Sequence, residues 1–141
     1  MTSNAAALPS PRLTPAIVAG HGDFAAGMVS AVEQIVGQTD LLIPFSNRSL
    51  SSAGIEQALR GIVDEHGVVV IFTDLPGGSA TIAASRLVRD RKDLVLITGA
   101  SLPMLLHYAT TTMTSGADMA RGAVERATLS MRTISGKGEK A

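Results

Sequence analysis

Two ionisable side chains follow apolar runs that end in glycine-rich turns. His21 lies between two glycines directly after the apolar run 16–19, and Asp74 closely follows the apolar run 68–72. An imidazole can act as a nucleophile, and a carboxylate that accepts its Nδ1 proton fixes the tautomer and leaves Nε2 free to attack. The two residues therefore suggest nucleophilic catalysis by an oriented histidine.

Each of these residues alone also has an ordinary structural interpretation. His21 could be a solvated turn histidine, and Asp74 could cap the helix that follows it. The glycines on both sides of His21 leave the imidazole uncovered, which suits a large incoming partner. The combination of both residues at one place is what favours catalysis.

A third candidate feature is the Gly77-Gly78-Ser79 turn after Asp74. It could be a flexible turn with a serine N-cap, but backbone N–H groups at a helix N-terminus can also hold a phosphoryl group. Ser79 could add a hydroxyl donor. The turn matches neither a Walker motif nor G-x-G-x-x-G, so it does not indicate ATP or NAD. The three features together predict a phosphoryl-accepting histidine, a reaction that requires mainly positioning and charge stabilisation.

The elements that must position these residues alternate between strands and helices. Apolar runs and helical spacing predict strands at 16–20, 41–45, 68–73 and 94–98, and helices at 24–36, 51–65, 79–89, 102–108 and 117–134. This order predicts a doubly wound α/β fold of the flavodoxin-like type, with a mainly parallel sheet in strand order 2-1-3-4 and helices on both faces. Strands one and three are then neighbours, so His21 and Asp74 meet at the carboxyl edge of the sheet.

Length and composition describe one small domain with an aliphatic core. The chain has 141 residues, 45% of them hydrophobic but only 3% aromatic, no cysteine and a formal net charge of zero. These values exclude disulfides and thiolate catalysis, and they give no indication of a nucleic-acid partner. The apolar runs are too short to span a bilayer, and the first residues do not resemble a secretory signal. We expect a disordered tail at 1–14, one domain at 15–134, a frayed tail at 135–141, and a cytoplasmic protein.

Three segments together resemble the enzyme IIA component of the phosphoenolpyruvate-dependent sugar phosphotransferase system, in its mannose/fructose/sorbose/N-acetylgalactosamine class. The segment AIVAGHGDFA is similar to the strand of that family that ends in a His-Gly pair. FTDLPGGS is similar to its Thr-Asp-x-x-Gly-Gly-Ser/Thr turn, and ITGASLPML to its Gly-x-Asn-x-Pro-Met-Leu segment. The resemblance runs in order from Ala16 to Tyr108.

The resemblance implies a cytoplasmic phosphocarrier that is peripherally associated with a membrane permease complex and uses no cofactor or metal. His21 would accept a phosphoryl group on Nε2 from phospho-HPr and pass it to a histidine of enzyme IIB, with the membrane subunits IIC and IID engaged indirectly. Asp74 would orient His21, and Gly77, Gly78 and Ser79 would bind the phosphoryl group. A homodimer is also implied.

The chain departs from the family at three positions. Gly20 stands where serine or threonine is common, Ala80 where many relatives have proline, and Ser101 where asparagine is usual. Ser101 is a candidate docking residue for a partner protein. Phe24 and Met28, close to His21, could form an apolar docking rim or could simply pack in the core.

His66 is interpreted as a cation at the C-terminus of a helix, and His107 as a surface histidine that could instead border the site. The three histidines share no short spacing, so they do not predict a metal site.

Two other classes of function stay open at this point. The chain could be a phosphorylation-dependent regulatory module without a transport role. It could also be a flavodoxin-like enzyme that binds a small molecule, which would require a deep pocket. Neither the sugar nor the cognate enzyme IIB is encoded in any motif that we recognise.

Overall fold

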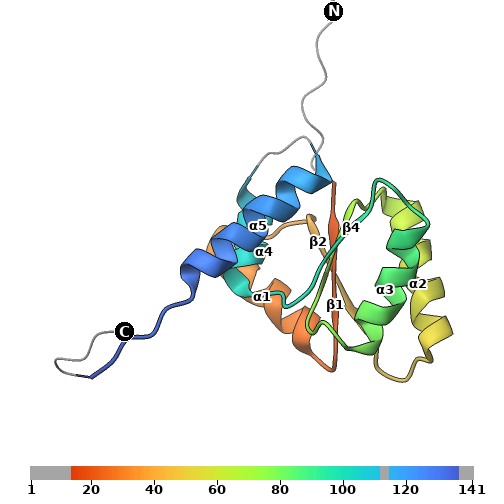
Figure 1. The fold of residues 1–141 in the computed structure, drawn as a ribbon, viewed down its shortest axis with the longest axis horizontal. Coiled ribbons are helices and arrows are strands. Elements are labelled where there is room, and N and C mark those ends of the chain that lie inside the picture. The colour runs from red at the N-terminus through yellow and green to blue at the C-terminus, as the bar shows by residue number, and fades with distance from the viewer. Residues whose placement is uncertain (1–13, 112–114, 137–141) are drawn as a thin grey trace, which may run out of the picture.

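A four-stranded parallel sheet lies at the centre of the structure, a computed structural model that describes residues 14–111 and 115–136 (Figure 1). The strand order is β2-β1-β3-β4. The strands are β1 (Ala16–Gly20), β2 (Leu42–Ser46), β3 (Val70–Thr73) and β4 (Val95–Ile97). β1 pairs in parallel with both β2 and β3, and β3 pairs in parallel with β4. The predicted strand order 2-1-3-4 is confirmed.

Helices cover both faces of the sheet, as predicted for a doubly wound fold. The helices are α1 (Phe24–Val36), α2 (Ser52–His66), α3 (Ser79–Arg89), α4 (Leu102–Thr110) and α5 (Gly116–Ser130). α1, α4 and α5 lie on one face, and α2 and α3 lie on the other (Figure 1). Within the described ranges, none of these helices combines the length and the apolar character needed to cross a membrane.

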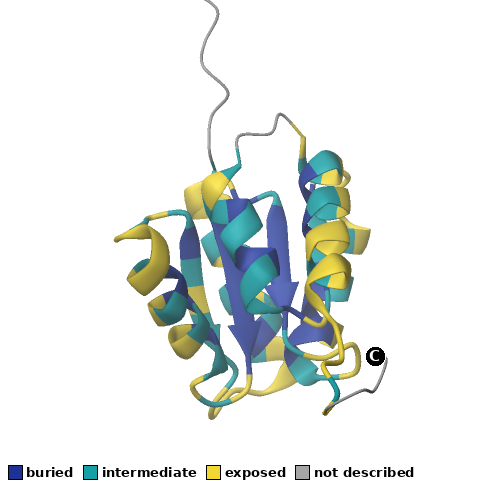
Figure 2. Ribbon diagram, turned by 90° about the vertical axis from the view of Figure 1, so that its left-hand side faces the viewer, coloured by how far each residue is buried: buried dark blue, intermediate teal, exposed yellow. Residues whose placement is uncertain are grey.

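The two central strands, β1 and β3, are buried along their whole length (Figure 2). Alternate side chains enter opposite cores: Ala16 and Val18 pack with α1, α4 and α5, whereas Ile17 and Ala19 pack with α2 and α3. Helices on both faces explain why these strands are continuous apolar runs instead of alternating ones. β2 lies at the edge, where Pro44 is tolerated because an edge strand has one side free of partners.

Capping residues fix the ends of α2. The hydroxyl of Ser51, the N-cap, accepts a hydrogen bond from the N–H of Gly54 at 3.0 Å. Gly67 ends the helix with φ +67°, and the N–H groups of Gly67 and Val68 both donate to the carbonyl of Val63. Val68 therefore still belongs to the helix terminus, which is why β3 begins at Val70 and not at residue 68 as predicted.

The prediction that the last helix continues to residue 134 was wrong. α5 ends at Ser130, and Met131 already has extended backbone angles (φ −83°, ψ 125°). Met131 and Ile134 are 73% and 85% exposed. Helices in proteins are stabilised mainly by burying one face, and the last buried residue of α5 is Ala123. Residues 131–134, all exposed, therefore lack the core contact that would hold further helical turns. The tails predicted for the two termini lie almost entirely outside the described residues.

Candidate functional site

His21 occupies the turn between the carboxyl end of β1 and the start of α1. The turn is closed by a hydrogen bond from the N–H of Phe24 to the carbonyl of His21 at 3.0 Å. Gly22 has φ +52°, a conformation that residues with a Cβ rarely adopt, so a glycine is favoured there. The imidazole is 54% exposed. The turn thus presents the ring at the surface, as predicted from the flanking glycines.

Asp74 lies next to His21 although the two are 53 residues apart in the chain. One carboxylate oxygen, Oδ2, accepts two hydrogen bonds from His21, one from ring Nδ1 at 2.7 Å and one from the backbone N–H at 2.9 Å. A carboxylate only accepts, so the ring proton lies on Nδ1 and the lone pair lies on Nε2. The backbone contact holds the carboxylate against the same residue whose ring it orients. This geometry suits a nucleophilic Nε2.

The pKa of Asp74 reflects two opposing influences. Burial, the larger single influence, raises the pKa of the carboxyl, whose side chain is only 10% exposed. The hydrogen bonds from the ring and backbone of His21, with the attraction of its charge and the influence of the Leu75 backbone, act against burial and together lower the pKa below the ordinary 3.8. The carboxylate therefore stays ionised at neutral pH. Its other oxygen, Oδ1, is buried without a hydrogen-bond partner among the described residues.

Two glycines allow the close approach of these groups. A Cβ on Gly20 would lie 2.8 Å from Asp74 Oδ2 and 2.9 Å from its Cγ, and a Cβ on Gly78 would lie 3.0 Å from Cε1 of His21. A side chain at Gly20 would therefore collide with the carboxylate in its present position. Gly77 differs, because a Cβ there would meet open space. The glycine that departs from the family pattern thus has a steric role in this chain.

The N-terminus of α3 lies beside the imidazole through Gly78, its N-cap. The first intrahelical bond runs from the N–H of Ile82 to the carbonyl of Gly78, so the preceding amides of the first turn have no carbonyl acceptor inside the helix. Such amides, together with the helix dipole, attract anions. Below this turn, the buried hydroxyls of Thr73 and Thr81 lie 2.6 Å apart, and Thr81 also donates to the carbonyl of Leu75. These threonines, which the sequence analysis missed, hold the Asp74 turn in place.

The loop after β2 supplies two polar residues that the sequence analysis also missed. The side-chain N–H of Asn47 donates to the hydroxyl oxygen of Ser79 at 2.8 Å. Arg48 lies 3.4 Å from the carboxylate of Asp23, and both of these side chains are exposed. The loop follows the carboxyl end of β2, so the rule that brought His21 and Asp74 together would also have indicated this segment.

Two of the three candidate docking residues are partly exposed, and the third has a buried hydroxyl oxygen. Phe24 and Met28 are half-buried on α1 and pack against the core, which agrees with the alternative of core packing. Part of each side chain stays accessible. Ser101 is the N-cap of α4, and its hydroxyl oxygen is buried without a hydrogen-bond partner within the described ranges. The hydroxyl of Ser101 is therefore not displayed to a partner.

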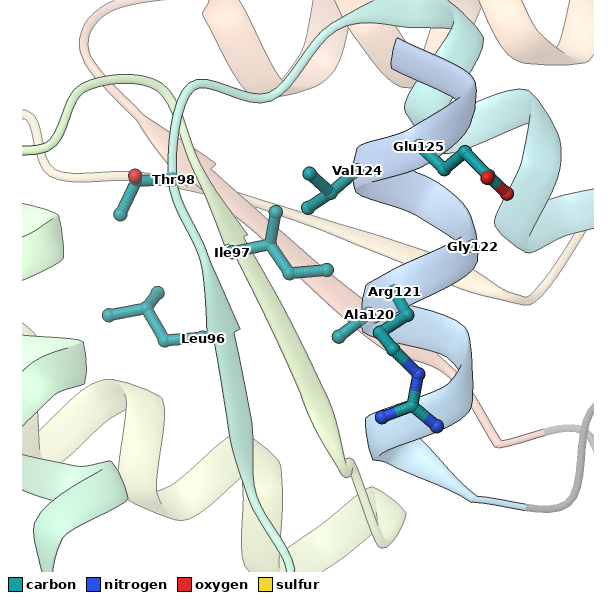
Figure 3. A pocket seen from close by; sticks show the side chains of 8 residues that line it. All are labelled: Leu96, Ile97, Thr98, Ala120, Arg121, Gly122, Val124 and Glu125. Carbon is teal, nitrogen blue, oxygen red and sulfur yellow. The ribbon is translucent and has the colours of Figure 1, made fainter. Parts of the chain in front are cut away.

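A hollow of about 870 Å³ lies away from these residues, between β4 and α5 (Figure 3). Its lining consists of Leu96, Ile97, Thr98, Ala120, Arg121, Gly122, Val124 and Glu125. Neither His21 nor Asp74 belongs to it. The hollow therefore gives no support to a small-molecule enzyme that uses the His21–Asp74 pair.

Comparisons with known sequences identify one family. Residues 16–125 match the model described as "PTS system fructose IIA component". The chain is 31% identical over 100 residues to the fructose-specific EIIA component of the PTS system of Bacillus subtilis (strain 168), a match that covers 64% of this chain and 65% of that protein. It is 28% identical over 107 residues to the sorbose-specific EIIA component of Klebsiella pneumoniae, covering 73% and 78%. The match thus spans slightly less than two thirds of the fructose-specific relative.

Solved structures of similar proteins share the fold. The EIIA component of the phosphotransferase system from Streptococcus agalactiae superposes with a TM-score of 0.78 at 22% identity, over 84% of this chain and 95% of that one. The mannose/sorbose-specific IIA subunit from Enterococcus faecalis gives 0.77 at 18% identity, over 92% of this chain and 100% of that one. At these identities the likeness establishes the architecture alone.

Proposed function

Because this chain belongs to the family of PTS system fructose IIA components, we propose that it is a phosphocarrier of a sugar phosphotransferase system in which His21 carries the phosphoryl group. The observation that carries the proposal is the 2.7 Å contact between His21 Nδ1 and Asp74 Oδ2. This contact leaves the lone pair of Nε2 available on an exposed ring. The curated relatives, named as fructose-specific and sorbose-specific components, support a role in sugar uptake.

The transfer proceeds by displacement at phosphorus. Nε2 of His21 attacks the phosphorus of a donor phosphohistidine, a new N–P bond forms as the donor N–P bond breaks, and the donor nitrogen recovers its electron pair. Nδ1 keeps its proton, so the ring becomes positively charged, and the Asp74 carboxylate stabilises this charge. In this proposal the phosphoryl oxygens are held by the first amides of α3, supported by the position of the helix N-cap Gly78 beside the imidazole, and by the Ser79 hydroxyl. The onward transfer repeats the same chemistry with His21 as the leaving group.

Phospho-HPr is the proposed donor and a histidine of enzyme IIB is the proposed acceptor. Both partners are proteins, and both must reach the same nitrogen, which agrees with an imidazole that is half exposed at the surface of a turn. The family resemblance is the basis for proposing a cytoplasmic location, at the permease formed with the membrane subunits IIC and IID. We also propose a homodimer, on the basis of the family resemblance alone.

The direct test is reconstitution of the phosphate relay. The full chain is incubated with phosphoenolpyruvate, enzyme I and HPr, and the protein is analysed for an acid-labile, alkali-stable phosphoryl group. We expect labelling of the wild type and none of His21→Ala, while the matched control His66→Ala, which removes an exposed histidine at the end of α2, keeps full labelling. An unlabelled wild type, or a His21→Ala variant that labels normally, would overturn the proposal.

Addition of a cognate enzyme IIB then tests the second half of the relay. Loss of label from the chain with appearance of label on enzyme IIB supports transport. A label that stays on the chain in the presence of enzyme IIB contradicts the transport role and favours a regulatory module.

A further inference from the structure

We propose that Asn47 is a positioning residue for phosphoryl transfer, which fixes the Ser79 hydroxyl so that its proton is directed to the phosphoryl group on His21. The inference rests on the proposed function and adds to it a residue from a third segment of the chain. Asn47 does not touch the reacting atoms. It acts through Ser79, which is one residue away from the glycine that lies against the imidazole.

The contact itself defines which group donates. The side-chain N–H of Asn47 donates to the oxygen of Ser79 at 2.8 Å, across 32 residues of sequence. A hydroxyl carries a single proton and two lone pairs, and the amide nitrogen can only donate. Because Asn47 occupies a lone pair of Ser79, the proton of that hydroxyl remains free for another acceptor. A bound phosphoryl group offers such an acceptor.

The surroundings of Ser79 indicate where this proton is needed. Ser79 is the first residue of α3, and a Cβ on Gly78, the residue before it, would lie 3.0 Å from Cε1 of His21. Cε1 is bonded to Nε2, the atom that attacks phosphorus. A hydroxyl at the first position of the helix therefore adjoins the space that the phosphoryl oxygens enter. Without a fixed rotamer, the hydroxyl would be free to donate to water instead.

The backbone of the loop holds Asn47 at this place. The N–H of Asn47 donates to the carbonyl of Gly20, the residue before His21, at 3.1 Å, and its own carbonyl accepts from Leu50 at 3.2 Å. Ser49 has φ +67°, a left-handed conformation that a serine rarely adopts. Strained residues persist where the surrounding contacts determine the conformation, and they are concentrated at functional sites. Asn47 thus connects the end of β1, which precedes His21, with the start of α3, whose N-cap lies against the imidazole.

A purely structural role for Asn47 makes a different prediction. If its contact with Ser79 only tied the loop to α3, a contact in which Ser79 donates to residue 47 would serve equally well, and reversing the direction of the hydrogen bond would not slow transfer. A positioning role requires that Asn47 have no kinetic effect once the Ser79 hydroxyl is absent, and that reversing the hydrogen bond slow transfer. A double-mutant cycle tests whether Asn47 acts through Ser79, and the variant Asn47→Asp, which reverses the bond, separates positioning from a structural tie.

The experiment compares the wild type, Asn47→Ala, Ser79→Ala and the double variant in phosphoryl transfer from phospho-HPr. We expect each single variant to lower kcat about five- to tenfold with KM nearly unchanged, because one hydrogen bond is lost in the transition state. The double variant should be no slower than Ser79→Ala. Ser46→Ala is the matched control, since it removes a side-chain hydrogen bond of the same loop, to the N–H of Arg48, without touching Ser79.

Asn47→Asp is a second variant that keeps the shape of the side chain. A carboxylate cannot donate, so Ser79 must turn its proton toward residue 47, and kcat should fall at least as far as in Asn47→Ala. The inference is overturned if Asn47→Ala and Asn47→Asp transfer at the wild-type rate, or if the effects of Asn47→Ala and Ser79→Ala multiply in the double variant. A wild type that is not phosphorylated on His21 would instead refute the proposed function itself.

Discussion

Replacement of Asp74 by asparagine separates the charge of this carboxylate from its hydrogen bonds. Oδ2 accepts both contacts from His21, so the carbonyl oxygen of an asparagine in the same rotamer accepts both and preserves the tautomer of the ring. The asparagine amino group then takes the place of Oδ1, which is buried without a partner in the described part of the chain. What the variant loses is the negative charge facing the ring.

The magnitude of the loss follows from the geometry. Two unit charges about 4 Å apart attract by about 4 kcal/mol at an effective dielectric constant of about 20. The imidazole is 54% exposed, so solvent screens this attraction, and we expect about 1.5–3 kcal/mol to disappear from the transition state. Transfer from phospho-HPr to Asp74→Asn should then be about 10- to 150-fold slower than to the wild type.

A rapid-quench assay at saturating phospho-HPr measures this rate, and circular dichroism shows whether the variant is folded. Asp64→Asn is the matched control, because it removes a largely exposed carboxylate that pairs with Arg91 at 2.8 Å, outside the His21–Asp74 pair. The control should transfer at the wild-type rate. A folded Asp74→Asn variant within about threefold of the wild type would refute the argument that the charge of Asp74 stabilises the transferring ring.

Three further predictions concern the same contacts. Gly78→Ala places a methyl group 3.0 Å from Cε1 of His21, so the ring must shift by a few tenths of an ångström. Transfer should therefore slow by about 3- to 10-fold in the quench assay. Gly77→Ala keeps the backbone N–H and adds a methyl group that points into open space, so it should not slow transfer. Gly20→Ala places a methyl group 2.8 Å from Asp74 Oδ2 and should lower the free energy of unfolding by about 1–3 kcal/mol in urea titrations; unchanged stability would contradict the steric argument. The contribution of the Asp74 charge to stability should be fully present above pH 3.8 and should disappear as the pH falls from there through the lowered pKa. The difference in unfolding free energy between wild type and Asp74→Asn should therefore shrink below pH 3.8. A difference that grows below pH 3.8 would contradict this prediction.

The strand order could be predicted because few arrangements satisfy the rules for parallel sheets. Alternating strands and helices with right-handed crossovers leave a small number of topologies, and the two most apolar runs, in β1 and β3, had to be central. Once these strands were neighbours, the proximity of His21 and Asp74 at their carboxyl ends followed. The steric role of Gly20 did not follow, since it depends on the rotamer that Asp74 adopts.

The end of α5 and the contact of Asn47 could not be predicted by the same reasoning. Whether a helix continues past Ser130 depends on a core surface to cover, and the sequence alone does not define where that surface ends. The contact between Asn47 and Ser79 depends on a loop in which Ser49 adopts a positive φ, and local preferences disfavour that conformation for a serine. Both features are set by tertiary contacts instead of local pattern.

The separation of 53 residues between His21 and Asp74 also determines when the contact between them can form during synthesis of the chain. A nascent chain that has left the ribosome only as far as β2 already contains the histidine, but it lacks the strand that delivers the carboxylate and the helix that adjoins the ring. Parallel strands pair only after the crossover helix between them is available. Incomplete or misfolded copies therefore carry a histidine that Asp74 does not orient, and under the proposed function such copies would accept a phosphoryl group more slowly than finished molecules.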